Sequence, residues 1–66
     1  PPAGITNVIV GTSAADNFDN IRICLSQRAA GGTAARYNIY SFYVNTNQFR
    51  SSLNQNTPAT AIANCP

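Results

Sequence analysis

The segment from Val8 to Asn20 contains both carboxylates of the chain, Asp16 and Asp19. Two carboxylates three residues apart can act as a general acid and base only in a cleft that keeps one protonated and the other ionised. The chain has no His, Lys or Glu, so no Ser or Cys nucleophile has a base beside it. We therefore expect no catalytic residue and no enzymatic activity.

The same segment partly resembles the glycine-rich repeat that binds calcium in β-rolls, with Gly11, Asp16 and Phe18 in matching places. It departs from the repeat at Thr12 and Ala14, where that repeat has glycines. The repeat binds calcium between successive copies, and a site standing alone needs about six to eight oxygen ligands. We expect neither a metal site nor a cofactor here.

A structural role explains the spacing of these residues better. Ser13 and Asp16 are placed as in a capping box, with Asp where Glu or Gln is usual. This pattern predicts one helical turn after Ser13, with Phe18 entering the core and a strand starting after Asp19. The acidic loop is then a connector.

The composition sets the class of protein. A chain of 66 residues predicts a single small domain, residues 1–66. Only six residues are charged, and the polar residues are mainly amides and hydroxyls, including nine Asn, six Thr and five Ser. The four arginines are dispersed, so no basic patch predicts nucleic-acid binding. No apolar run approaches the roughly 18 residues of a membrane span, so we expect no membrane insertion.

The two cysteines, Cys24 and Cys65, predict one disulfide, with a pair of buried free thiols as the alternative. On the chain-entropy model, closing so long a loop stabilises the fold by about 4 kcal/mol. A disulfide and a low-charge composition together predict a secreted or cell-surface protein. Because the chain begins at Pro1 without Met, we expect a processed mature form or a piece of a longer protein.

Strand patterns occur over residues 5–10, 20–28 and 35–44, which are rich in β-branched and aromatic residues or alternate in polarity. In residues 45–56 the spacing of apolar side chains fits a helix or a strand, and we favour a strand because Asn and Ser disfavour helix interiors. The final segment, 57–66, fits either a helix starting at its Thr-Pro pair or a short strand. We expect an all-β fold: a small antiparallel sandwich or barrel-like sheet with at most one or two short helical turns.

The central hairpin spans residues 20–44. Gly31 and Gly32 suit a tight two-residue turn, which pairs Ile23 with Tyr40. This register gathers the large apolar side chains on one face, whereas a one-residue slip would scatter them. We expect this face to be the core, and it contains Ile21, Ile23, Leu25, Tyr40 and Phe42.

The opposite face of the hairpin is mixed in character. It contains Arg22, Cys24, Ser26, Arg28, Tyr37, Ile39, Ser41 and Tyr43. One interpretation is a half-covered face, packed by the C-terminal tail that Cys65 would tie to Cys24. The other is a partner-binding face, since Tyr and Arg are enriched in interface hot spots. Its candidate binding residues are Arg22, Arg28, Tyr37 and Tyr43.

Two functional classes agree with these observations. The first is a structural subunit of an extracellular filament, coat or surface layer, because a low-charge surface and strand edges without Lys permit self-association. The alternative is a secreted binding module, such as an inhibitor, a lectin-like domain or an effector, which would use the Tyr/Arg face. The expected partner is another copy of the chain or another extracellular protein, and nothing in the sequence supports a small-molecule or glycan ligand.

Overall fold

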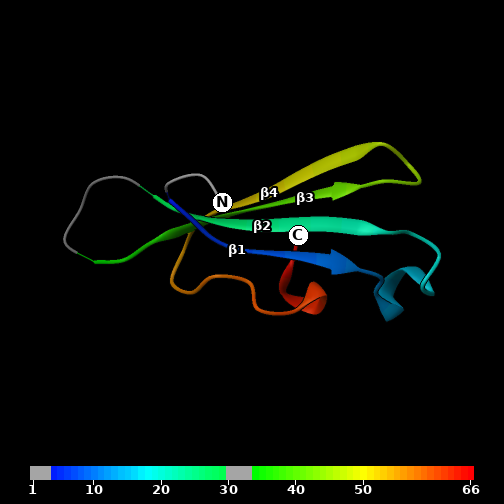
Figure 1. Cartoon of the computed structure of the whole chain (residues 1–66), viewed down its shortest axis with the longest axis horizontal. Helices are drawn as coiled ribbons and strands as arrows, with labels where there is room; N and C mark the ends of the chain where they lie inside the picture. Colours follow the sequence, from blue (N-terminus) through cyan, green and yellow to red (C-terminus); the bar gives the residue numbers. More distant parts are fainter. Residues whose placement is uncertain (1–3, 30–33) are drawn as a thin grey trace.

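Four strands form one antiparallel sheet (Figure 1); β-branched and aromatic residues favour the first and third, while the second alternates in polarity and the fourth is mostly polar. The computed structural model describes residues 4–29 and 34–66. The strands are β1 (Ile5–Gly11), β2 (Arg22–Arg28), β3 (Tyr37–Tyr43) and β4 (Gln48–Gln55), and they are arranged across the sheet in sequence order. The all-β prediction is confirmed, as is a strand in the ambiguous segment before the tail. The described strands form one open sheet, however, and neither a sandwich nor a barrel.

The pairing of β2 with β3 differs from the predicted register by two residues. Ile23 lies opposite Phe42, not Tyr40, and Leu25 lies opposite Tyr40. Because side chains alternate with a period of two, this difference moves the pairs without exchanging the faces. The predicted turn at Gly31 and Gly32 lies outside the described residues.

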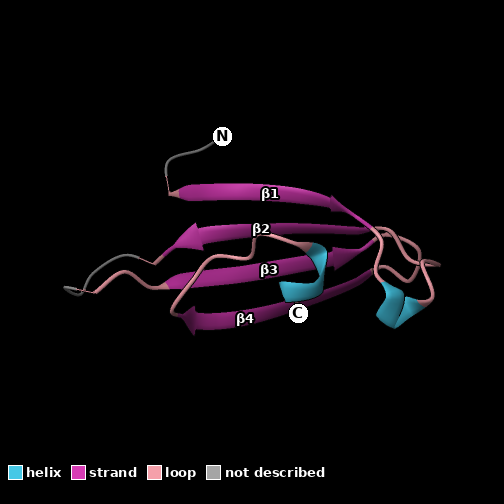
Figure 2. Cartoon of the chain, turned by 90° about the horizontal axis from the view of Figure 1, so that it is seen from below, coloured by secondary structure: helices cyan, strands magenta, loops and turns pink. Residues whose placement is uncertain are grey.

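The C-terminal tail, residues 56–66, crosses one face of the sheet, and Figure 2 shows the 3-10 turn η2 (Ile62–Asn64) lying over the strands. Neither the helix nor the strand expected at Thr57 forms; the chain has no regular secondary structure from residue 56 to the start of η2. The tail contributes Ala59 and Cys65 to a buried cluster with Cys24 and Ile39. The prediction that the tail packs against the mixed face is confirmed.

The prediction of the core face is wrong. Ile23, on the face expected to be the core, is 40% exposed, whereas Tyr43 on the opposite face is 4% exposed. The reason is the position of Cys24. Its side chain points to the mixed face, so the bond to Cys65 holds the tail there, and nothing in residues 4–29 and 34–66 covers the apolar face.

The acidic loop forms the predicted turn, η1 (Ala14–Asp16), with Ser13 as its N-cap. The Ser13 hydroxyl accepts a hydrogen bond from the Ala15 amide at 3.2 Å. Phe18 does not enter the core and is 65% exposed. Asn17 and Phe18 both adopt left-handed backbone conformations, with φ of 52° and 59°, which reverse the chain after η1.

Candidate functional site

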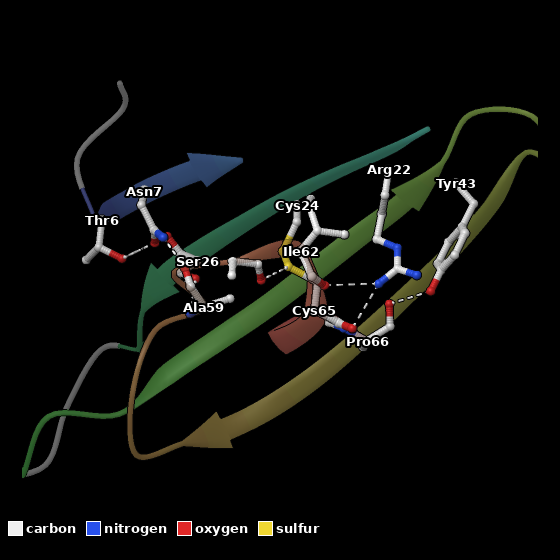
Figure 3. The surroundings of a disulfide bond; sticks show 11 residues. Thr6, Asn7, Arg22, Cys24, Ser26, Tyr43, Ala59, Ile62, Cys65 and Pro66 are labelled. Carbon is white, nitrogen blue, oxygen red and sulfur yellow. Dashed lines mark hydrogen bonds between the residues drawn. A yellow bond between two sulfur atoms is a disulfide. The ribbon is translucent and has the colours of Figure 1, made fainter. Parts of the chain in front are cut away.

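The mixed face beneath the tail is here called the covered face; its buried residues are Arg22, Cys24, Ser26, Ile39, Ser41 and Tyr43. The disulfide between Cys24 and Cys65 closes this face and confirms the predicted bond. Cys24 is in the second strand and Cys65 is the penultimate residue, and both are buried. The bond therefore fixes the end of the tail over the centre of the sheet (Figure 3).

Arg22 is the first residue of β2; it is buried and joins this strand to the acidic loop and the tail. Its Nη2 donates to the Asp16 carboxylate at 2.9 Å. Its Nη1 donates to the carbonyl oxygens of Cys65 at 3.1 Å and Ile62 at 3.3 Å (Figure 3). A buried guanidinium is stable only when its charge and its donors have partners. Asp16 supplies the opposite charge, so one of the two acidic residues has a structural role here.

Tyr43 closes the covered face beside Arg22. The guanidinium groups of Arg22 and Arg50 lie 4.4 and 4.7 Å from the centroid of its ring, within the range of cation–π attraction. Its hydroxyl donates to the Pro66 carbonyl at 2.9 Å. The tyrosine is therefore engaged by its neighbouring strands and by the last residue of the tail.

A second attachment holds the start of the tail. The Ala59 amide donates to the Ser26 hydroxyl at 2.9 Å, and the Asn7 side-chain amide donates to the Ala59 carbonyl. Ser41 is as deeply buried as Ser26, yet its hydroxyl has no partner among the described residues. The tail is thus held at both ends by side chains that point from the same face of the sheet.

The predicted binding residues separate into two pairs. Arg22 and Tyr43 lie beneath the tail, where both Nη atoms of Arg22 and the Tyr43 hydroxyl have partners, while Arg22 Nε is buried without one among the described residues. Arg28 and Tyr37 lie opposite each other at the other end of the hairpin, with Arg28 exposed and Tyr37 half-buried. The structure does not bring the four together as one accessible surface, and their binding role stays a prediction.

Other candidate chemistry is sparse. An open depression between the tail and β3 is lined by Ile39, Pro58, Ala59 and neutral polar side chains. Within residues 4–29 and 34–66 there is no group of three or more His, Cys, Asp or Glu side chains able to hold a metal ion. None of the described helical turns has the length and apolar character needed to cross a membrane.

The largest unusual surface is the face opposite the tail, here called the open face. It consists of the following residues: Val8, Val10, Ile21, Ile23, Leu25, Tyr40, Phe42, Val44, Phe49 and Leu53. Val10 and Phe49, at its two edges, are 64% and 66% exposed. Among the strand residues that share this face, none is charged. Sequence reasoning recognised part of this set but assigned it to the core; the side on which Cys24 points was the signal that could have corrected the assignment.

Regular rows of side chains run across the open face. In one row Val10 pairs with Ile23, Ile23 with Phe42, and Phe42 with Phe49, so the row crosses all four strands. The ring of Tyr40, in the neighbouring row, stacks on Phe49 with centroids 6.0 Å apart. In the row that contains Phe49, side-chain size increases from the β1 edge to the β4 edge, whereas the neighbouring row, from Val8 through Leu25 and Tyr40, ends at the small polar Ser51.

Comparison with known proteins gives no relative from which a role could be transferred: no protein-family model, curated protein or solved structure matches this chain.

Proposed function

We propose that this chain is a non-catalytic structural subunit of an extracellular assembly and acts through self-association. The observation that carries the proposal is the open face, an apolar and uncharged surface that spans all four strands. Monomeric soluble proteins rarely expose a contiguous apolar patch larger than a few hundred Å². A sheet with about 4.8 Å between strands and about 3.3 Å per residue presents a face of roughly 20 by 23 Å, or about 460 Å², which is as large as the largest apolar patch of a typical monomer, and such patches are often functional.

The free energy available at this face is large for a small domain. Each large apolar side chain that leaves water contributes roughly 1.5–3 kcal/mol, and the total stability of a chain of this size is only about 3–10 kcal/mol. The open face has several such side chains, including Ile23 and Phe49, with no element of the described chain over them. A partner that covers these side chains would therefore stabilise the complex and, through it, the folded state of the sheet.

The low charge of the chain supports self-association in particular. Two identical surfaces repel each other when both carry the same net charge, and the strand residues of the open face carry none. The disulfide supports an extracellular location, since such bonds persist in oxidising compartments.

The binding-module alternative has less support. Two of its four residues, Arg22 and Tyr43, are buried and hydrogen-bonded to the tail through Nη1 and the hydroxyl, so a partner would have to displace the tail to reach them. Arg28 and Tyr37 alone form a small surface at one end of the hairpin.

The experiment is a measurement of particle size on the oxidised protein over a dilution series, by sedimentation velocity and electron microscopy. We expect species heavier than the 7.0 kDa chain, and their fraction should increase with concentration. A particle of 7.0 kDa at every concentration would contradict the proposal.

A further inference from the structure

We infer that the open face docks against the open face of a second copy, with β1 of each copy lying over β4 of the other, so that two open sheets form one sandwich. This inference rests on the proposed function and names its contact surface and its geometry. The copies would be related by a twofold axis that runs between the sheets, parallel to the strands. Two sheets stacked in this way lie about 10 Å apart with their strands inclined by about 30°.

The size of the face fits such a contact. Its projected area, about 20 by 23 Å or 460 Å² from strand spacing and rise, gives about 920 Å² for two copies, which is close to the roughly 1,000 Å² in total that a specific interface needs and smaller than a standard interface. The covered face cannot serve instead, because the tail already occupies it from Ala59 to Cys65. The open face is therefore the surface on which a second sheet can pack.

The order of side chains along the row that ends at Phe49 selects the orientation. In the row that starts at Val10 and ends at Phe49, small side chains lie at the β1 edge and large ones at the β4 edge. A twofold axis parallel to the strands reverses this row in the second copy. Val10 then faces Phe49 of the other copy, and Ile23 faces Phe42, so each bulky ring meets a smaller side chain. An axis perpendicular to the strands would place Phe49 on Phe49 and Val10 on Val10, which leaves a gap at one edge and crowding at the other.

Two charge-introducing variants test this arrangement, Val10→Lys and Phe49→Glu. Both positions are exposed and lie on edge strands, so we expect the fold to persist, which circular dichroism and the intact disulfide verify. In each homodimer the new charge would be buried twice against an apolar side chain. We expect the dimer dissociation constant of each variant to rise at least about 100-fold, as measured by sedimentation. Ala63→Lys is the matched control for Val10→Lys, because it adds the same positive charge at an exposed site of the tail, away from the open face.

Mixing the two variants distinguishes the orientation. In a heterodimer with β1 over β4, the new lysine faces the new glutamate across the interface, and the second edge keeps the native contact of Val10 with Phe49. We expect an equimolar mixture to form dimers at concentrations where neither variant does so alone. Within one chain the two positions are three strand spacings apart, about 14 Å, so the effect requires two chains.

Each other result has a definite meaning. If the wild type self-associates and the single variants do so equally well, the open face is not the contact and this inference is wrong, although the proposed function stands. If the single variants are monomeric but their mixture does not dimerise, the orientation with β1 over β4 is wrong. If the wild type is monomeric at every concentration, the proposed function and this inference both fail. Where a charged variant does not fold, Val10→Thr and Phe49→Thr provide the milder test, with weaker association expected.

Discussion

The two faces of the sheet have opposite relations between composition and burial. The covered face contains Arg22, Ser26 and Ser41 and is buried, whereas the open face contains Ile23 and Phe49 and is exposed. Hydrophobicity alone would predict the reverse. The difference teaches that burial depends on what is available to cover a face. Here the only cover in the described chain is a short tail, and a covalent bond decides on which side it lies.

The tail also suits the polar face in its own composition. It carries few large apolar side chains and offers backbone amides and carbonyls, which Ser26, Arg22 and Tyr43 bind. Such a segment satisfies polar groups but cannot cover a wide apolar surface. The two faces therefore need different covers, and the tail serves only one of them.

Removing the disulfide should have the largest effect on this contrast. We expect the double variant Cys24→Ala/Cys65→Ala to lose about 4 kcal/mol of unfolding free energy, because the 41-residue separation leaves a long unconstrained loop in the unfolded chain. Urea denaturation measures the loss, and wild-type protein in a reductant is the control. A variant as stable as the oxidised wild type would show that noncovalent contacts alone hold the tail.

A pair of substitutions on opposite faces tests the burial contrast directly. We expect Tyr43→Ala to cost about 3 kcal/mol or more, since it removes a buried ring and the hydrogen bond to Pro66. Ile23→Ala should cost about 1 kcal/mol, because its side chain is already partly in water. Both are measured by thermal unfolding at a concentration where the chain is monomeric. Equal losses of stability would contradict the burial contrast between the two faces. A larger loss for Ile23→Ala would reverse the assignment of the faces.

If Tyr43→Ala does not fold, Tyr43→Phe isolates the hydroxyl. It keeps the ring between its neighbouring arginines and removes only the bond to the tail. We expect a loss of about 1 kcal/mol.

Two buried serines sharpen the comparison within the covered face. Ser26→Ala should cost about 1–3 kcal/mol, because the buried Ala59 amide loses its acceptor. Ser41→Ala should be neutral or stabilising, since its buried hydroxyl has no partner among the described residues. Chemical denaturation of the two variants, which remove the same atom, gives the difference. A cost at Ser41 equal to that at Ser26 would mean that the Ser41 hydroxyl is bonded in solution.

The smallest effects are expected at Phe18, outside both faces. Phe18→Gly should leave stability unchanged or slightly higher, because glycine adopts φ near 59° without the steric cost that a side chain has there. Phe18→Val should lose about 1 kcal/mol, since a β-branched residue is unfavourable in that region. A loss of several kcal/mol for Phe18→Gly in thermal unfolding would instead place the ring in a core.

The all-β class, most of the strands and the disulfide were predictable from the sequence, but the single open sheet and the contacts of the site were not. Strands over the segments that contain Ile9, Leu25 and Ile39 follow from residue types that favour extended backbone, and the turn after Ser13 follows from its cap. The ion pair of Asp16 with Arg22 joins a loop to a strand, and no local pattern indicated it. The hairpin part of the open face was identified as one set of residues, but its exposure and its continuation onto β1 and β4 were not foreseen.

By itself, the sequence determined the extended segments, the alternation that divides each strand between two faces, and the two cysteines able to bond. These properties depend on residue types and on a period of two, both of which are local. Only the tertiary structure decided the two-residue offset between β2 and β3, and which face the tail covers. Pairing register and cover depend on contacts between residues far apart in the chain, such as Cys24 with Cys65, whose free energy no local pattern contains.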